Sequence, residues 1–194
     1  MIGCAECLLL HMYRWDCAAM LPEDIRQKLY ERIAAADHPR ELAVDIVFAL
    51  QERYGYVSDE LLQEAAELLG MTSLELEEIA TFYEFIYREP VGKYVIHVCD
   101  GVVCWMQNHQ SVLHEVSARL GIQLGETTPD GLFTLLPACC IGYCDRAPAM
   151  MINRKVYGEL TPERIDYLLQ ELRNQAPAGQ SIETYVSTDP LSES

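Results

Sequence analysis

The stretch Cys139-Cys140-Ile141-Gly142-Tyr143-Cys144-Asp145-Arg146-Ala147-Pro148 places three of the chain's eight cysteines in one short loop. A second pair, Cys99 and Cys104, lies upstream, and both groups follow an apolar, strand-like run. Bridging sulfides and ferric iron prefer soft sulfur ligands, so four thiolates from two such loops suit an iron–sulfur centre. The two loops therefore predict one [2Fe–2S] cluster.

The downstream loop offers one cysteine more than a four-ligand site needs. Cys99 and Cys104 form a C-x4-C pair. Cys144 can be paired with Cys140, which gives C-x3-C, or with Cys139, which repeats the spacing of the first loop. From the chemistry of the thiols alone, both choices stay open.

Other uses of these cysteines fit their spacing less well. Structural zinc sites and thioredoxin-like redox pairs both favour C-x2-C, so a zinc-stabilised interaction module and a metal-free thiol protein are weaker hypotheses. Clustering in two loops favours metal ligation in a reducing compartment over a disulfide framework. A Rieske-type role for His97 would need a second histidine in a C-x-H loop, which the sequence does not supply.

The excess of acidic over basic side chains limits the kinds of molecule that the chain can bind. The 194 residues carry 30 acidic and 14 basic side chains, a formal net charge of −16, which excludes binding of nucleic acid through its phosphates. No apolar run approaches the roughly 18 residues that a membrane helix requires, and residues 1–15 lack the early basic residues of a secretory signal. We therefore expect a soluble chain that docks on other proteins without inserting into a membrane.

Residues 21–87 follow a helical pattern with recognisable helix starts. Pro39 suits a first helical position, and Ser58 and Thr72 suit N-caps, the latter within a Thr-Ser-Leu-Glu capping box. Short connections between these segments predict a small antiparallel bundle. The aromatic side chains near its end are assigned to packing: Phe82, Tyr83 and Phe85.

After Pro90 and Gly92 the hydrophobic period changes to that of strands. The expected elements are strands at Lys93–Val98 and Leu132–Leu136, a helix at Gln107–Leu120, a hairpin of Ala149–Ile152 and Lys155–Tyr157, and a last helix from Thr161. This βαβ–ββα order is the thioredoxin-like arrangement, and its first unit favours parallel pairing of the two strands.

The sequence thus predicts an α/β fold, α+β overall, in which a small N-terminal helical bundle is followed by a thioredoxin-like domain. The expected divisions are a poorly ordered extension at 1–20, the bundle at 21–90, the [2Fe–2S] domain at 91–175 and a disordered tail at 176–194. Cys4 and Cys7 are interpreted as incidental thiols of the extension, and Cys17 is assigned no role.

Parallel pairing would bring the two cysteine loops together, because the carboxyl ends of neighbouring parallel strands meet at one edge of the sheet. Cys104 also lies just before a helix, where free backbone N–H groups favour negative charge. Gly101 and Gly142 either let backbone approach sulfur or make plain turns, and the two interpretations are compatible. Pro148 suits either a cis peptide bond or an ordinary trans turn.

These residues together resemble a known family, the E subunit of bacterial NADH:quinone oxidoreductase (respiratory complex I), a thioredoxin-like [2Fe–2S] protein. The resemblance spans about Leu21 to Arg173 and is carried by the cysteine spacing and by the stretches Ala80-Thr81-Phe82-Tyr83, Pro90-Val91-Gly92-Lys93, Asp130–Leu135, Ala147-Pro148 and Leu160-Thr161-Pro162-Glu163. The family's pattern aligns its third ligand with Cys140. It therefore implies Cys99, Cys104, Cys140 and Cys144 as the cluster ligands, with no catalytic residue in this chain.

The resemblance also implies a place in a larger oxidoreductase. The family transfers electrons beside NADH and FMN, which it leaves to a partner chain, the flavoprotein F subunit, and the helical bundle would dock on that subunit and on the large iron–sulfur G subunit. The chain is then expected on the cytoplasmic side of the inner membrane, peripheral to it through the complex. The equivalent diaphorase subunit of an NAD-linked hydrogenase or formate dehydrogenase has the same cluster site, so the site alone does not separate these assemblies.

Overall fold

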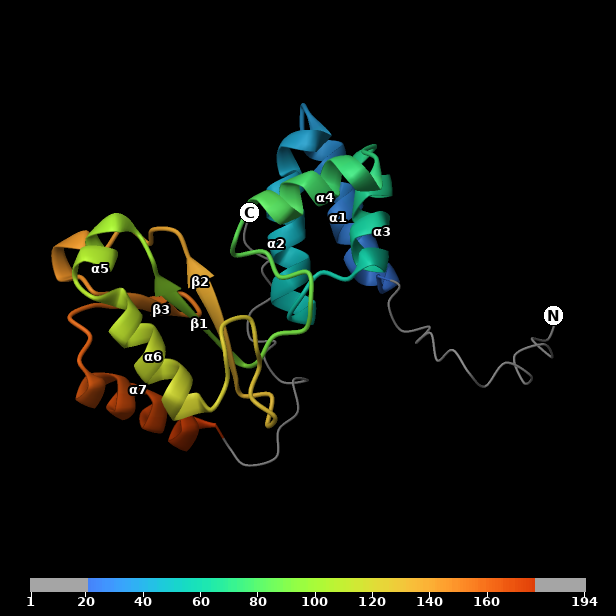
Figure 1. The fold of residues 1–194 in the computed structure, drawn as a ribbon. Helices are drawn as coiled ribbons and strands as arrows, with labels where there is room; N and C mark the ends of the chain where they lie inside the picture. The colour runs from blue at the N-terminus through green and yellow to red at the C-terminus, as the bar shows by residue number, and fades with distance from the viewer. Residues whose placement is uncertain (1–20, 177–194) are drawn as a thin grey trace.

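The structure, a computed structural model, describes residues 21–176, so the predictions for 1–20 (including Cys4, Cys7 and Cys17) and for 177–194 lie outside the described residues. Within that range helices come first and a sheet follows, and each part has its own hydrophobic core. Figure 1 shows the first four α-helices as one group and the sheet with the later helices as another. The α/β fold class is confirmed, and the domain boundary at residues 90 and 91 stays a prediction.

Four α-helices make up the first part: α1 Glu23–Ala35, α2 Ala43–Tyr54, α3 Asp59–Leu69 and α4 Ser73–Phe82, with a 3-10 turn at Pro39–Leu42 before α2. The predicted N-caps are confirmed. The Ser58 hydroxyl accepts a hydrogen bond from the Leu61 N–H at 3.3 Å, and Thr72 and Glu75 form the capping box. The inner faces of the helices meet in a core that includes Leu29, Ile46, Leu50, Val57 and Leu76.

The fourth helix ends earlier than its sequence pattern predicts. After Phe82 the backbone leaves the helix and runs irregularly over residues 83–88 toward the sheet, so the helical period no longer decides which side chains face inward. The prediction that Phe82 and Tyr83 pack inside is wrong, because their exposed fractions are 80% and 40%. Phe85 does pack, edge-on against the His97 ring at a centroid distance of 4.9 Å.

The sheet has four strands: β1 Tyr94–Cys99, β2 Phe133–Ala138, β3 Met150–Ile152 and β4 Lys155–Tyr157, in the spatial order β2-β1-β3-β4. β1 and β2 pair in parallel, with Cys99 opposite Ala138, and the other neighbours pair antiparallel. The predicted parallel pair and hairpin are therefore confirmed. Because β1 and β2 run in the same direction, the loops that follow them begin at the same edge of the sheet.

Two long helices, α6 His109–Leu120 and α7 Pro162–Gln175, cover one face of the sheet (Figure 1) and share its core. A short helix that the sequence pattern did not predict, α5 Val102–Met106, precedes α6. Asn108, in the left-handed region at φ 62°, separates the two helices, so the single helix predicted from Gln107 begins later than expected. Among residues 21–176, no helix is long and apolar enough to cross a bilayer.

Candidate iron–sulfur site

The two cysteine loops leave the sheet side by side. Cys99 is the last residue of β1, and its N–H donates to the Ala149 carbonyl at 3.1 Å. The next N–H, that of Asp100, donates to the Ala138 carbonyl at the end of β2 at 2.9 Å. These bonds extend the strand pairing into the loops, so Cys99 lies beside the start of the segment that carries Cys140.

Gly101 is the position at which the loops touch. A Cβ added there would lie 2.9 Å from the Cys139 carbonyl oxygen, 3.2 Å from the Cys140 Cβ and 3.3 Å from the Cys140 Sγ. Its φ of −54° is open to any residue, so the glycine is required by the close approach and not by its backbone angle. Gly142, in contrast, has φ 76°, and a Cβ added there would have no atom within 4 Å, as at a turn glycine.

The four sulfurs form two adjacent pairs. Cys99 and Cys104 are each 2% exposed and pack together with Ala149 in one buried cluster. The Cys140 and Cys144 sulfurs lie 4.0 Å apart, and both residues are exposed. One pair therefore lies against the protein interior and the other at the surface.

The thiols oppose one another's ionisation. Burial raises the pKa of Cys104 to about 11, and its contact with Cys99 adds to the shift. The pKa of Cys144 is also raised, first by its hydrogen bond to Cys140 and further by the charge of Cys99. Thiolates at these positions would need a compensating positive charge, which ferric iron supplies when it binds.

Cys139 has a different environment from its neighbour. Its N–H donates to a Glu84 carboxylate oxygen at 3.0 Å, and the same carboxylate raises the pKa of the exposed Cys139 thiol. The Cys140 sulfur instead lies close to Gly101 and to Cys144. This placement supports Cys140 as the third ligand, and the assignment of the four ligands stays a prediction.

His97 is buried, and its ring nitrogens contact Tyr87 and Pro137 and not the cysteine sulfurs. Its ring is fully buried, with Nε2 at 3.1 Å from the Tyr87 hydroxyl and Nδ1 at 3.1 Å from the Pro137 carbonyl oxygen. Because a carbonyl oxygen only accepts, Nδ1 carries the proton and Nε2 accepts from Tyr87. Burial lowers the pKa of His97 and raises the pKa of Tyr87 to about 12. This geometry does not support a Rieske-type role.

The donor set suits an iron–sulfur cluster. Four soft sulfur donors form two adjacent pairs, on loops that can approach because Gly101 has no side chain, and this arrangement fits a [2Fe–2S] group. The second loop ends at a cis Ala147–Pro148 peptide bond, one of the two forms that the sequence allowed.

Comparison with known proteins also indicates a [2Fe–2S] protein. The family described as thioredoxin-like [2Fe-2S] ferredoxin matches residues 29–173. The chain belongs to this family. The predicted thioredoxin-like [2Fe–2S] class is thereby confirmed, and the cofactor in the family's name is the one that the cysteines predict.

Relatives of this ferredoxin include components of larger enzymes. It is 40% identical to the E subunit of the NADH-quinone oxidoreductase of Pseudomonas aeruginosa, over 78% of this chain and 91% of that one, and 38% identical to its Escherichia coli counterpart of the same name, over 76% and 89%. Among solved structures, an NAD+-reducing [NiFe]-hydrogenase superposes with a TM-score of 0.58 at 28% identity over 74% of this chain. The ferredoxin spans only 25% of that hydrogenase chain.

An apolar surface flanks the cysteine loops of the ferredoxin. On α5, next to Cys104, the exposed fractions of Val102, Trp105 and Met106 are 72%, 63% and 73%. Exposed apolar side chains of this size are typical of surfaces that bind other proteins. Their exposure was not predicted from the sequence, although the run Val-Val-Cys-Trp-Met around a cysteine was a visible signal.

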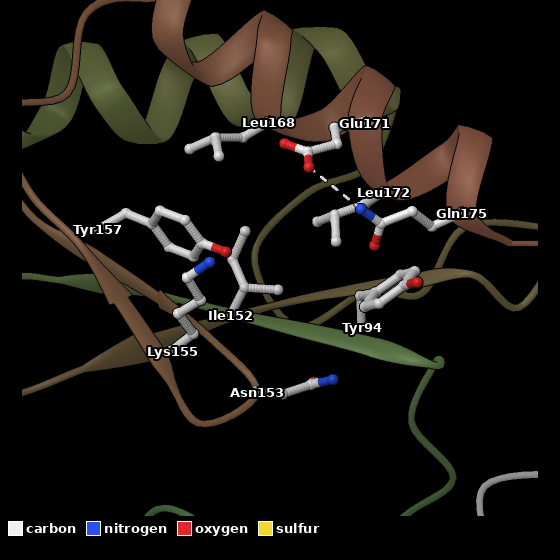
Figure 2. Close-up of a pocket in the computed structure, with 9 residues that line it drawn as sticks. All are labelled: Tyr94, Ile152, Asn153, Lys155, Tyr157, Leu168, Glu171, Leu172 and Gln175. Carbon is white, nitrogen blue, oxygen red and sulfur yellow. Dashed lines mark hydrogen bonds between the residues drawn. The ribbon is translucent and has the colours of Figure 1, made fainter.

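A cavity of about 260 Å³ lies elsewhere, between the β3–β4 hairpin and α7. Figure 2 shows its lining, with the rings of Tyr94 and Tyr157 opposite Leu168 and Leu172 of α7. Tyr94 begins β1 whereas Cys99 ends it, so the cavity lies toward the opposite end of the strand from the cysteine loops. No residue that lines it takes part in the candidate cluster site.

Proposed function

We propose that this chain is the [2Fe–2S] electron-transfer subunit of an NADH:quinone oxidoreductase. The observation that carries the proposal is the convergence of Cys99 and Cys104 with Cys140 and Cys144 at one edge of a thioredoxin-like sheet. The ~40% identity to subunits of that name, over most of both chains, supports the assembly. When bound, the cluster supplies one-electron transfer.

The chain's own residues hold this group and shield part of it. Cys99 and Cys104 would bind on the buried side, where Ala149 and the partly buried Ile141 and Tyr143 exclude water. Cys140 and Cys144 would bind on the exposed side. This asymmetry leaves one side of the site open to a redox partner, while the other side is buried in the protein.

The partner at the open side is, in this proposal, the flavoprotein F subunit with FMN and NADH. The apolar residues Val102, Trp105 and Met106 would form part of that contact, and the helical part would dock on the G subunit. Neither contact requires the chain to enter a bilayer. The chain would then be peripheral, held on the cytoplasmic side of the inner membrane by the rest of the complex.

A second candidate is the equivalent subunit of an NAD-linked hydrogenase. The observation that favours it is the superposition on an NAD+-reducing [NiFe]-hydrogenase. The two candidates share the cluster and its ligands and differ in the chains around them. Affinity purification of the tagged chain from its host separates them, because the first candidate predicts recovery of quinone-reductase chains and the second recovery of hydrogenase chains.

The cluster itself is tested on the purified full chain. We expect two iron and two acid-labile sulfide per chain and a paramagnetic signal after dithionite reduction. A colourless, anaerobically prepared sample that contains zinc or no metal would refute the proposal. Trp105→Ala is expected to keep the iron content and to lower the yield of co-purified flavoprotein; an unchanged yield would remove α5 from the contact.

A further inference from the structure

One carboxylate from the helical part reaches the cluster loop. Glu84 lies in the irregular segment after α4, and its side chain accepts a hydrogen bond from the Cys139 N–H at 3.0 Å, across 55 residues of sequence. Cys139 immediately precedes the predicted ligand Cys140. The contact therefore connects the helical part, which supplies no predicted cluster ligand, to the residue directly before a predicted ligand.

The segment that carries Glu84 is fixed from both sides. On the helical side, the Gln51 side-chain amide donates to the Phe85 carbonyl at 2.7 Å and its oxygen accepts from the Tyr87 N–H. On the sheet side, Phe85 and Tyr87 both contact the buried His97 ring. The backbone that follows Glu84 is therefore held by several contacts, and these contacts keep Glu84 next to the cluster loop.

His97 connects the same segment to the strand that delivers the loop. Its Nδ1 donates to the Pro137 carbonyl at 3.1 Å, two residues before Cys139. Residues 84–87 therefore reach this region directly, through Glu84 and Cys139, and indirectly, through the His97 ring and Pro137. We propose that Glu84 is a positioning residue for the cluster loop, and that its negative charge makes the cluster harder to reduce.

Charge and hydrogen bonding both support this inference, which rests on the proposed function. Reduction adds one negative charge to the site, and a nearby carboxylate opposes it. In addition, backbone N–H groups that donate to cluster sulfur favour reduction, and Glu84 occupies the Cys139 N–H.

Two substitutions separate these effects. Glu84→Gln keeps an oxygen that can accept from Cys139 and removes the charge, whereas Glu84→Ala removes both. Glu89→Gln is the matched control, because it removes the same charge from an exposed position of the same connection, nearer the beginning of β1. Each variant is prepared as the full chain with its cluster, and the midpoint potential is read from the reduced-state paramagnetic signal during a redox titration, alongside iron and sulfide content.

We expect Glu84→Gln to shift the midpoint to a more positive potential than wild type and Glu89→Gln, by an amount that shrinks at high ionic strength. Glu84→Ala is expected to shift it further. Equal midpoints for Glu84→Gln and Glu89→Gln in fully loaded chains would refute the charge effect, and equal shifts for the two Glu84 variants would refute the positioning role. A wild-type chain without a cluster would refute the proposed function and this inference with it.

Discussion

The contact at Gly101 gives the sharpest test of how the two loops converge. Replacement by alanine adds one methyl group, and its carbon would lie 2.9 Å from the Cys139 carbonyl oxygen, where ordinary contacts begin at 3.4 Å. The overlap of 3.4 − 2.9 = 0.5 Å falls on backbone, which cannot rotate away as a long side chain can. We therefore expect Gly101→Ala to push the segment with Cys139 and Cys140 away from the segment with Cys99 and Cys104.

Two opposing terms set the size of the effect. Overpacking of this kind costs about 1–3 kcal/mol. Alanine also restricts the unfolded chain, which stabilises the fold by about 0.4–1 kcal/mol where the native backbone suits it, as φ −54° does here. The net expectation is a loss of about 0–2.6 kcal/mol, with a middle value near 1.3 kcal/mol that corresponds to roughly 3–5 °C in Tm for a chain of this length.

The assay compares thermal unfolding, iron content and the reduced-state paramagnetic spectrum with those of a control. Gly121→Ala is suitable, because Gly121 caps the end of α6 at φ 70° and a Cβ added there would have no atom within 4 Å. The substitution should cost about 1 kcal/mol without affecting the cysteine loops. We expect both variants to melt earlier and only Gly101→Ala to change the spectrum or the iron content. A Gly101→Ala chain with wild-type Tm and spectrum would refute the close approach of the loops.

Three further substitutions test separate parts of the structure. Cys140→Ser is expected to abolish or alter the cluster and Cys139→Ser to leave iron content near wild type; the reverse pattern in an iron assay would reassign the third ligand. Tyr87→Phe leaves the buried Nε2 of His97 without its donor, so urea unfolding should show a loss of about 1–3 kcal/mol, and an unchanged midpoint would contradict that hydrogen bond. Thr72→Ala removes the capping box of α4 and should lower the free energy of unfolding by about 1 kcal/mol in the same assay. The visible spectrum should stay unchanged; loss of the cluster's absorption would contradict the expectation that this helix start does not affect the cluster.

Local chemistry made much of this fold predictable. Helix starts at Ser58 and Thr72 follow from side chains that satisfy free N–H groups, and the structure has both. The two cysteine-bearing loops could be placed together because a strand–helix–strand unit of this size pairs in parallel, and β1 and β2 do. In each case a short stretch of sequence was sufficient for the prediction.

What the sequence pattern missed depends on contacts between distant segments. The helical period continues past Phe82 in the sequence, but residues 83–88 leave the helix and contact His97 on β1 and Cys139, which directly follows β2. Phe82 is left exposed at the bend. Likewise, the left-handed conformation of Asn108 makes α6 begin at His109, later than the predicted start at Gln107, and hydrophobic spacing indicates neither that break nor the short helix α5 before it.

Strand β1 connects the helical part to the cysteine loops, because it contacts residues 85 and 87 through His97 and ends at Cys99. Side chains alternate along a strand, so Ile96 and Val98 enter the core under α6 and α7 while His97 faces the opposite side, against Phe85 and Tyr87. A slip of one residue would put the imidazole among apolar side chains and remove both of its hydrogen bonds, at a cost of several kcal/mol. The register of β1 is therefore fixed from two faces, and the position of Cys99, its last residue, is fixed with it. The segment that secures one face also carries Glu84 to the other loop, so both halves of the cysteine site are held by contacts that the helical part helps to make.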